Sequence, residues 1–205
     1  MKIIAHRGND NINKENSIES ILNSLNKCYV DGVEFDIRKT KDNKFIINHD
    51  PFYKNYFIKY TKSRKLKKIG LNTLDEVLNK ICNDKIILIE VKEDGNIKTT
   101  AKYLYSILKK YKLNIYLCSF NYKFITHFKN KYNNIKCGLI IGGGINIKHI
   151  NNNLDFNLIS YRYKGKIPNK ETFIWTVNNI KDIKKEYNII TDKSKKIYDY
   201  LKSIN

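Results

Sequence analysis

The sequence is poor in the residues that cross-link a chain or divide it into parts. Its 205 residues include only two prolines, and no low-complexity tract or clear linker interrupts them. The four cysteines form no CxxC pair and no metal-ligand spacing, which argues against a disulfide scaffold and favours the reducing cytoplasm. We expect one domain over residues 1–205, large enough for a sizeable core.

Long hydrophobic runs are absent as well. No stretch reaches the ~20 apolar residues that a membrane helix needs. The first apolar run, Ile3 to Ala5, is too short for a signal peptide. We therefore expect a soluble, cytoplasmic protein.

Acidic residues are scarce beside basic ones, at 20 against 39, so the net charge is +19. Only four of the basic residues are arginine, and the excess lysine accompanies many asparagine, isoleucine and tyrosine residues, which is typical of a genome-wide composition bias. A solvated, lysine-rich surface is the first interpretation of this charge. A field that attracts an anionic substrate, a membrane surface or a nucleic acid is the alternative.

What the chain does contain is a regular alternation of short β-rich runs with helical patterns. Strands are predicted at 3–5, 33–37, 86–91, 115–119, 137–141, 158–162, 173–177 and 188–191. Apolar residues three and four apart predict helices at 16–28, 73–82 and 97–111. Eight strands, each followed by a helix or by a loop that has room for one, predict an α/β fold, a compact (β/α)8 TIM barrel. A doubly wound open sheet is the alternative.

Two local signals refine this fold. Thr73, followed three residues later by Glu76, is a capping box that begins a helix. The run at 44–50 is a ninth strand candidate, and the turn residues before it predict a hairpin with the second strand. The barrel is therefore expected to carry an extra hairpin strand after strand 2, outside the eight.

Polar residues gather at the carboxyl ends of the predicted strands, where barrels of this kind carry their chemistry. They are His6, Arg7, Glu34, Asp36, His49, Asp50, Glu90, Lys92, Ser119, Trp175 and Asn178. Glu34 and Asp36 share one face of an otherwise apolar strand, and Glu90 lies near the end of the next one. Three carboxylates at one site repel each other unless a divalent cation lies between them, and oxygen ligands favour Mg²⁺ or Ca²⁺ over zinc.

The basic residues at the same strand ends suit phosphate chemistry. His6 and His49 titrate near neutral pH and are candidates for an acid and base pair. Arg7 and Lys92 are candidates for holding a phosphate. Beside a metal site, and with these cations to hold a phosphate, the two histidines are interpreted as catalytic and not merely structural.

Other features carry weaker signals. His127 and His149 lie in helical or loop contexts with no acidic cluster nearby, and we interpret both as surface residues. The glycines at 142–144 predict a flexible loop after a strand and are only a weak candidate for a phosphate cradle.

Several short motifs, taken in order, resemble the glycerophosphodiester phosphodiesterase family. They are HRG at 6–8, EN at 15–16, VEFDIRKTKDNKFIINHD at 33–50, IEVK at 89–92, SF at 119–120, WTVN at 175–178 and ITD at 190–192. Any one of these motifs alone is a weak signal. Seven in the family's order, from the first predicted strand to the last, are a specific match.

The resemblance implies a barrel hydrolase that uses one divalent cation, Mg²⁺ or Ca²⁺, to cleave a small-molecule glycerophosphodiester into glycerol 3-phosphate and an alcohol. The resemblance implies that His6 and His49 are the acid and base, and that Glu34, Asp36 and Glu90 bind the metal. Arg7 and Lys92 would contact the phosphate, and Glu15 would orient Arg7 or a glycerol hydroxyl. Trp175 would form a wall against the substrate, and Asn178 would support that wall. Attack by water and attack by a glycerol hydroxyl, which forms a cyclic phosphate, both stay open.

One stretch departs from the family pattern. Residues 51–70 form a short, basic, aromatic segment in place of the usual insertion, and the customary Arg-Thr-Thr element is absent. The substrate therefore stays open, with lysophospholipase D-like or sphingomyelinase D-like head-group release at a membrane surface, or a specialised sugar phosphodiester, as alternatives. A shortened, solvated loop is the first interpretation of this segment, and peripheral contact with an anionic membrane is the second.

Two readings from other classes of protein remain as alternatives. One is a catalytically inactive barrel that serves as a binding module, which the presence of all three carboxylates and both histidines disfavours. The other is a basic nucleic-acid-binding protein, which would need basic and aromatic residues clustered on one face. Only 51–70 and 102–116 hint at such clustering, so no nucleic-acid partner is expected. The released alcohol, the physiological ion and the oligomeric state are not predicted.

Overall fold

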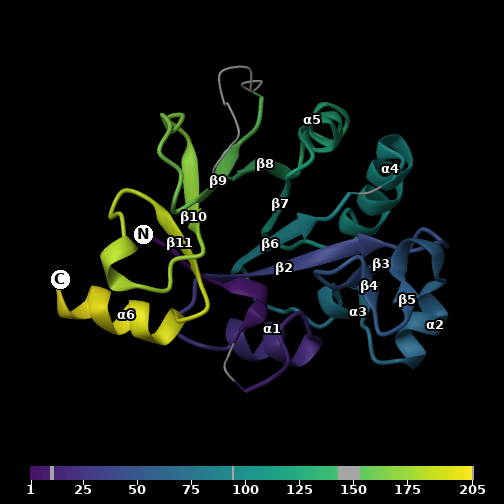
Figure 1. The fold of residues 1–205 in the computed structure, drawn as a ribbon, viewed down its shortest axis with the longest axis horizontal. Coiled ribbons are helices and arrows are strands. Elements are labelled where there is room, and N and C mark those ends of the chain that lie inside the picture. The colour runs from purple at the N-terminus through teal and green to yellow at the C-terminus, as the bar shows by residue number, and fades with distance from the viewer. Residues whose placement is uncertain (10–11, 94, 143–152, 205) are drawn as a thin grey trace.

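The computed structural model describes residues 1–9, 12–93, 95–142 and 153–204. Its centre is a closed ring of eight parallel strands, with helices outside it (Figure 1). The ring strands are β1 (Ile3–Ala5), β2 (Gly32–Lys39), β6 (Ile86–Val91), β7 (Ile115–Ser119), β8 (Lys136–Ile141), β9 (Phe156–Ser160), β10 (Glu171–Trp175) and β11 (Asn188–Thr191). Strand β1 pairs with both β2 and β11, which closes the ring. The predicted (β/α)8 barrel is confirmed, and the open sheet is excluded.

The extra strand lies where the hairpin pattern predicts it. Strand β3 (Phe45–Ile47) runs antiparallel to β2, with Ile37 opposite Ile47, and lies outside the ring. The turn between them contains Asn43 at a φ of 57°, a conformation that asparagine adopts more readily than most residues. The hairpin is therefore a local product of the sequence.

Helices cover the outside of the barrel. They are α1 (Ile18–Leu25), α3 (Leu74–Leu78), α4 (Ile97–Leu108), α5 (Tyr122–Lys131) and α6 (Ser194–Ser203), with short 3₁₀ helices η1 (His6–Gly8) and η4 (Ile180–Asp182). Helices α1, α3 and α4 end three or four residues earlier than predicted, and side-chain caps fix where they begin. Ser17 accepts a hydrogen bond from the Ser20 N–H at the start of α1. Thr73 accepts one from the Glu76 N–H at the start of α3, so the predicted capping box is confirmed.

Two strands lie two residues earlier than the sequence predicts. The apolar runs predict 158–162 and 173–177, whereas β9 and β10 begin at Phe156 and Glu171 and pair from there. The prediction was wrong at these ends because both strands contain a buried polar residue. Asn157 donates a side-chain hydrogen bond of 3.4 Å to Thr172, which satisfies both groups inside the sheet.

Residues 51–70 fold into a small unit of their own beside β3. It contains the two-stranded pair β4 (Phe52–Tyr53) and β5 (Tyr56–Phe57), the 3₁₀ helix η2 (Ile58–Tyr60) and α2 (Ser63–Lys68). Ile58 and Leu66 are fully buried and pack with Ile46 and Leu71 in a separate hydrophobic cluster. The segment is thus a folded element with its own small core.

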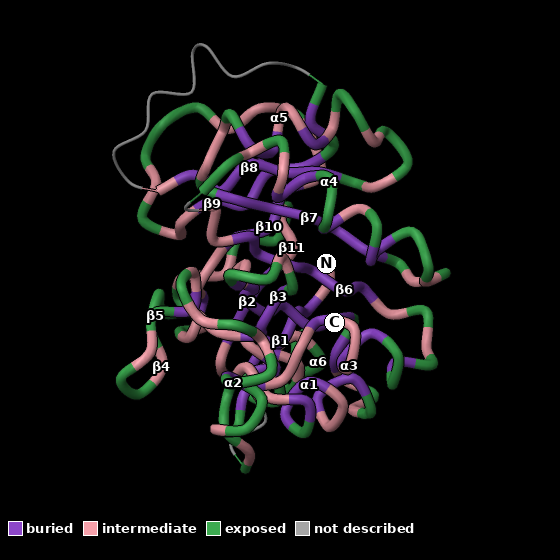
Figure 2. The backbone as a smooth tube through the Cα atoms, turned by 90° about the vertical axis from the view of Figure 1, so that its right-hand side faces the viewer, coloured by how far each residue is buried: buried purple, intermediate pink, exposed green. Residues whose placement is uncertain are grey.

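The ring strands are buried on both faces, as Figure 2 shows by their colour. Val33 and Phe35 of β2 face the main core between the barrel and its helices. Alternate residues face the barrel interior, which is filled by Ile4, Ile86, Leu88, Tyr116, Cys118, Ile140, Phe156, Leu158, Phe173 and Ile190. Glu34 is paired with Leu88 of this interior set, so Glu34 and Asp36 face the interior too.

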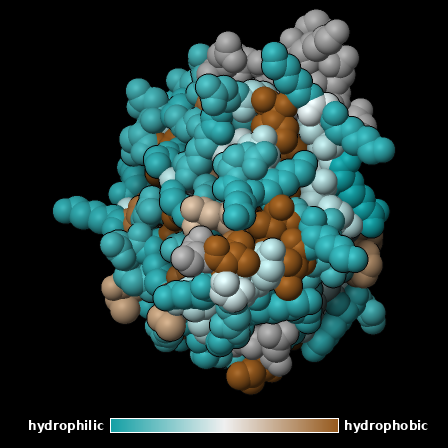
Figure 3. Space-filling view, turned by 90° about the vertical axis from the view of Figure 1, so that its left-hand side faces the viewer, coloured by the Kyte–Doolittle hydropathy of each residue, from teal (hydrophilic) through white to brown (hydrophobic). Residues whose placement is uncertain are grey.

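The outer surface agrees with the lysine-rich composition. On the face that carries α6 and both ends of the chain, hydrophilic side chains dominate, and hydrophobic ones appear near the centre and in smaller groups above and below it (Figure 3). Among the described residues, no helix has the length and apolar character needed to cross a membrane.

Gly32 offers a test of the barrel packing. A Cβ added to it would lie 2.5 Å from the backbone oxygen of Ile86 on β6 and 2.9 Å from the Ile4 side chain. We expect Gly32→Ala to lower the free energy of unfolding by about 1–3 kcal/mol, measured by urea denaturation, because the neighbouring backbone cannot move aside. Gly95→Ala is the matched control, since its nearest contact would be an ordinary 3.5 Å. An equal loss in both variants would contradict this account.

Candidate active site

Three carboxylates meet inside the barrel at its carboxyl end. Asp36 of β2 is directly paired with Glu90 of β6, and Glu34 precedes Asp36 by two residues on the same face. One oxygen from each of the three side chains lies within 4.8 Å of the others, and all three residues are buried. The sheet register alone is therefore enough to build a buried acidic triad.

Burial makes this triad electrostatically costly. Burial, together with the nearby charge of Asp36, raises the pKa of Glu34 to about 8 and that of Glu90 to about 7. Burial also opposes ionisation of Asp36, but the Lys92 ammonium and an Asn16 hydrogen bond lower its pKa below the usual value. The protein on its own thus favours an ionised Asp36, whereas Glu34 and Glu90 keep their protons to a higher pH than ordinary glutamates do.

The donor set fits a hard divalent cation. It consists of carboxylate oxygens alone, without sulfur or imidazole, and the three groups converge from two adjacent strands. A divalent charge between them would offset the repulsion that raises the pKa values of Glu34 and Glu90. Lys92 contributes part of this compensation: its ammonium contacts Glu90 and lies 3.1 Å from an Asp36 oxygen.

Asn16 holds Asp36 in place through two hydrogen bonds. Its amide nitrogen donates to the Asp36 carboxylate at 3.0 Å, and its amide oxygen accepts from the Asp36 backbone N–H at 3.0 Å. The Asn16 backbone N–H in turn donates to the Arg7 carbonyl at 2.9 Å. The EN motif at 15–16 contains this residue, but the motif by itself indicates no role for it.

Arg7 connects the loop after β1 to the triad. It has a φ of 54°, and its backbone N–H donates to Glu34 at 2.9 Å. Its guanidinium donates to Glu15 at 2.8 Å and lies 3.5 Å from Asp36. The contact between Glu15 and Arg7 is the one that the resemblance implied as an orienting contact.

His6 is held by the last strand of the ring. Because β11 pairs with β1, with Thr191 opposite Ala5, Asp192 follows directly beside His6. The two side chains are joined by a 2.7 Å hydrogen bond through Nδ1, and Nε2 faces Glu34 at 3.9 Å. Burial alone would lower the pKa of His6, but the Asp192 hydrogen bond and the Glu34 charge raise it above its ordinary value.

Asn178 extends this contact by one residue. Its amide nitrogen donates to the Asp192 carboxylate at 2.7 Å, and its amide oxygen accepts from the Thr191 hydroxyl and the Asp192 backbone N–H. The resemblance implied that Asn178 supports a wall formed by Trp175. In the structure its hydrogen bonds go to Asp192 and Thr191, and Asp192 in turn contacts His6.

Asp192 is the residue that sequence reasoning missed. The ITD motif at 190–192 contains Asp192, but the motif by itself indicates no function for it. The available signal was its position one residue past the last strand, because closure of the ring brings that position beside the end of the first strand.

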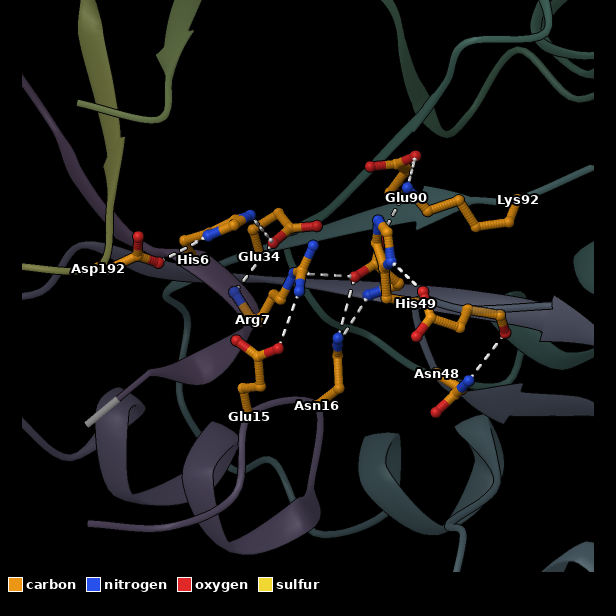
Figure 4. A network of polar contacts seen from close by, with 12 residues as sticks. His6, Arg7, Glu15, Asn16, Glu34, Asn48, His49, Glu90, Lys92 and Asp192 are labelled. Atoms are coloured by element: carbon orange, nitrogen blue, oxygen red, sulfur yellow. Dashed lines mark hydrogen bonds and ion pairs between the residues drawn. The ribbon is translucent and has the colours of Figure 1, made fainter. Parts of the chain in front are cut away.

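His49 approaches the triad from the other side. Figure 4 shows His6 and His49 on either side of the Arg7 guanidinium, with Glu90 and Lys92 beside His49. His49 Nδ1 is 2.9 Å from the Asp50 carboxylate, and the Arg38 side chain donates to the His49 carbonyl at 2.8 Å. Its side chain is 41% exposed, against 20% for His6, so His49 lies at the open edge of the site.

A cavity of about 460 Å³ opens beside Glu90 and Lys92. It is lined by Arg38, Glu90, Val91, Lys92, Glu93, Ser119, Phe120 and Asn121. Phe120 packs edge-on against Trp175 at 5.8 Å between ring centroids, and the Trp175 indole nitrogen has no hydrogen-bond partner among the described residues. The open end of the barrel therefore has one charged side and one aromatic side.

The described residues also include a third histidine, His127, and a buried thiol, Cys118, which is paired with Glu90 in the sheet. His127 is on α5, half-buried, and His149 and the glycines at 143–144 fall outside the described residues. Cys118 faces the barrel interior, where burial raises the pKa of its thiol far above the ordinary value. A thiol in that state is a poor nucleophile.

Comparison with known sequences supports the motif-based resemblance over the first part of the chain. Residues 6–75, which contain His6, Arg7, the β2 carboxylates and His49, match the sequence model of the glycerophosphoryl diester phosphodiesterase family. No curated protein sequence matches the chain.

Solved structures share the whole fold. A glycerophosphodiester phosphodiesterase from Parabacteroides distasonis matches with a TM-score of 0.83 at 20% identity, over 99% of this chain and 97% of that one. One from Thermotoga maritima gives 0.76 at 24%, over 100% and 98%. A phosphodiesterase from Oleispira antarctica, solved with the product sn-glycerol-3-phosphate, gives 0.84 at 19%, over 98% and 97%. The resemblance predicted from the motifs is confirmed: the chain carries the glycerophosphoryl diester phosphodiesterase pattern over residues 6–75, on the fold of solved glycerophosphodiester phosphodiesterases.

Proposed function

We propose that the protein is a metal-dependent phosphodiesterase that hydrolyses glycerophosphodiesters to glycerol 3-phosphate and an alcohol. The observation that carries the proposal is the buried acidic triad flanked by two histidines, with the Arg7 guanidinium between the histidines and Lys92 beside Glu90 and His49. The family match over residues 6–75 and the solved neighbours point to the same reaction class.

Glu34, Asp36 and Glu90 would hold one divalent cation, Mg²⁺ or Ca²⁺. When bound, such an ion supplies Lewis-acid stabilisation of the negative charge on the phosphate. Arg7 and Lys92 would add positive charge to the phosphate oxygens, since both cations already face the triad. Glu15 would keep the Arg7 guanidinium in its orientation through their 2.8 Å hydrogen bond.

His6 and His49 would move the two protons of the reaction. One imidazole takes the proton of the attacking hydroxyl, from water or from the glycerol moiety, and the other gives a proton to the leaving alcohol oxygen. The Asp192 carboxylate accepts from Nδ1 of His6 and thereby leaves Nε2 facing the site. Trp175 and Phe120 would form the aromatic wall against which the substrate packs.

The identity of the released alcohol distinguishes the proposed activity from its alternatives. A panel that contains glycerophosphocholine, glycerophosphoethanolamine, lysophosphatidylcholine and sphingomyelin separates the proposed activity from lysophospholipase D-like or sphingomyelinase D-like activity. Release of glycerol 3-phosphate from the first two, without choline release from the last two, is the expected result.

Turnover should require the cation. With Mg²⁺ or Ca²⁺ the purified protein should release glycerol 3-phosphate from a glycerophosphodiester, and chelation with EDTA or Glu34→Gln should abolish the release, because the triad loses its charge balance or a ligand. An enzyme-coupled glycerol 3-phosphate assay measures this. Full activity in EDTA would remove the metal assignment, whatever the reaction.

Cation binding should stabilise the fold more at higher pH. Glu34 has a folded pKa of about 8, above its unfolded value of 4.5, so the folded protein binds more protons between these values and its metal-free stability falls as pH rises through that range. A cation displaces that proton. The increase in melting temperature on adding Mg²⁺ or Ca²⁺ should therefore be larger at about pH 8 than at about pH 6. A shift that is independent of pH, or unchanged in Glu34→Gln, would contradict the assignment.

The two histidines should be essential, and Asp192 should act through His6. His6→Ala and His49→Ala should each lower kcat by roughly 100- to 10,000-fold.

Asp192→Asn should lower kcat and also lower the pKa of His6, because it removes a carboxylate at 2.7 Å. NMR titration of the imidazole measures this pKa. Asn178→Ala should move the same pKa in the same direction by less. An unchanged His6 titration in Asp192→Asn would show that Asp192 is only structural.

A further inference from the structure

Segment 51–70 carries a surface that the proposed chemistry does not use. We define the aromatic–basic patch as Phe52, Phe57 and Tyr60 together with the basic residues of the segment, Lys54, Lys59, Lys62, Arg64, Lys65, Lys67 and Lys68. The three rings are 52%, 58% and 69% exposed. Phe57 touches both others, with ring centroids 6.1 Å from Phe52 and 6.4 Å from Tyr60. The rings thus form one contiguous exposed cluster.

The rings are exposed although the segment has a small hydrophobic core. Ile58 and Leu66 are fully buried, and they pack with Ile46 and Leu71. The segment thus has Ile58 and Leu66 inside and Tyr53 and Tyr56 partly buried against them. Phe52, Phe57 and Tyr60 lie outside. A contiguous exposed apolar cluster beside a folded core indicates an interaction surface.

The charge of the segment selects the kind of partner. Its twenty residues contain seven basic side chains and no acidic one. Lys67 forms an ion pair with Glu76 outside the segment, at 2.6 Å. Lys59 lies over the ring of Tyr60, at 5.7 Å from its centroid, and Lys54 and Lys65 lie over the neighbouring rings of Tyr53 and Tyr56, at 5.7 and 5.1 Å. The surface therefore presents aromatic rings framed by positive charge, which is complementary to an anionic surface with an apolar layer beneath it.

The patch is continuous with the open end of the site. Strand β4 begins two residues after Asp50, the partner of His49. Lys14, which precedes Glu15, donates to the Tyr53 hydroxyl at 3.3 Å and lies 4.4 Å from its ring centroid. Figures 1 and 2 show β4 and β5 projecting from the side of the barrel near β3. A surface bound to the patch would therefore lie close to the mouth of the barrel.

We propose that the aromatic–basic patch docks the protein onto a membrane surface that contains acidic phospholipids. The rings of Phe52, Phe57 and Tyr60 enter the boundary between headgroups and acyl chains, and the lysines around them contact the lipid phosphates. A membrane fits better than single-stranded nucleic acid, because the rings meet at 63° and 59° as one projecting knob and do not present separate parallel faces for bases. Docking does not depend on the proposed hydrolase activity.

The test is sedimentation of the full chain with vesicles. Vesicles of phosphatidylcholine with about 30% phosphatidylglycerol should bind the protein in about 0.1 M salt, and vesicles of phosphatidylcholine alone should bind it far more weakly. The double variant F52A/F57A should bind the acidic vesicles on the order of tenfold more weakly. The triple variant K62Q/R64Q/K68Q should bind them about 100-fold more weakly.

Matched controls lie on α4 and at the far end of the chain. K98Q/K102Q/K109Q removes the same charge from the exposed surface of α4 and its end, and Y103A/I204A removes two exposed apolar side chains away from the patch. Both should keep binding within about twofold of the parent. Circular dichroism melts identify any variant that fails to fold. If one patch variant fails to fold, the other patch variant still tests the proposal, because all the substituted positions are exposed.

Several results would overturn the proposal. They are no binding to acidic vesicles, equal binding by F52A/F57A and the parent, or equal losses in the α4 charge control and the patch charge variant. Tighter binding of a single-stranded oligonucleotide than of vesicles, lost in the same patch variants, would replace the membrane with a nucleic acid as the partner. Retained turnover of a soluble glycerophosphodiester in F52A/F57A would separate a docking defect from a failure of the proposed hydrolase function.

Discussion

The mutual repulsion of three buried carboxyl groups is the constraint around which this end of the barrel is organised. Glu34, Asp36 and Glu90 lie on adjacent strands whose register puts them on one wall. Lys92 and Asn16 lower the pKa of Asp36 and thereby keep the central charge, while Glu34 and Glu90 keep raised pKa values. Because the site favours the protonated form of Glu34 and Glu90, a divalent cation bound there would replace those protons.

Closure of the ring supplies the second half of the site. His6 stands at the end of the first strand and Asp192 just past the last, and only the pairing of β1 with β11 makes them neighbours. Asn178 then fixes Asp192 from the connection that follows β10. The residues that contact His6 from this side are therefore far from it in sequence, which explains why local motifs assign them no role.

The connection between β2 and β6 carries most of the additions to the basic barrel. It contains the hairpin strand β3, His49 at the open edge of the site, and the small unit built on Ile58 and Leu66. Because this unit has its own core, it can expose Phe52, Phe57 and Tyr60 without loss of packing elsewhere. The proposed proton transfer by His49 and the proposed membrane docking thus both use this one stretch of chain, which the barrel supports.

Much of the fold and of the site followed from local sequence. Alternation of Val33 and Phe35 with Glu34 and Asp36 was enough to predict two carboxylates on one strand face, and the eight apolar runs were enough to predict the barrel. Strand ends at β9 and β10 were misjudged because Asn157 and Thr172 satisfy each other only within the folded sheet. Hydrophobic period and turn chemistry are local, so the sequence by itself determined which elements form and which side chains share a face. The partners of His6, the charge balance of the triad and the exposure of the rings depend on ring closure and burial, so only the tertiary structure decided them.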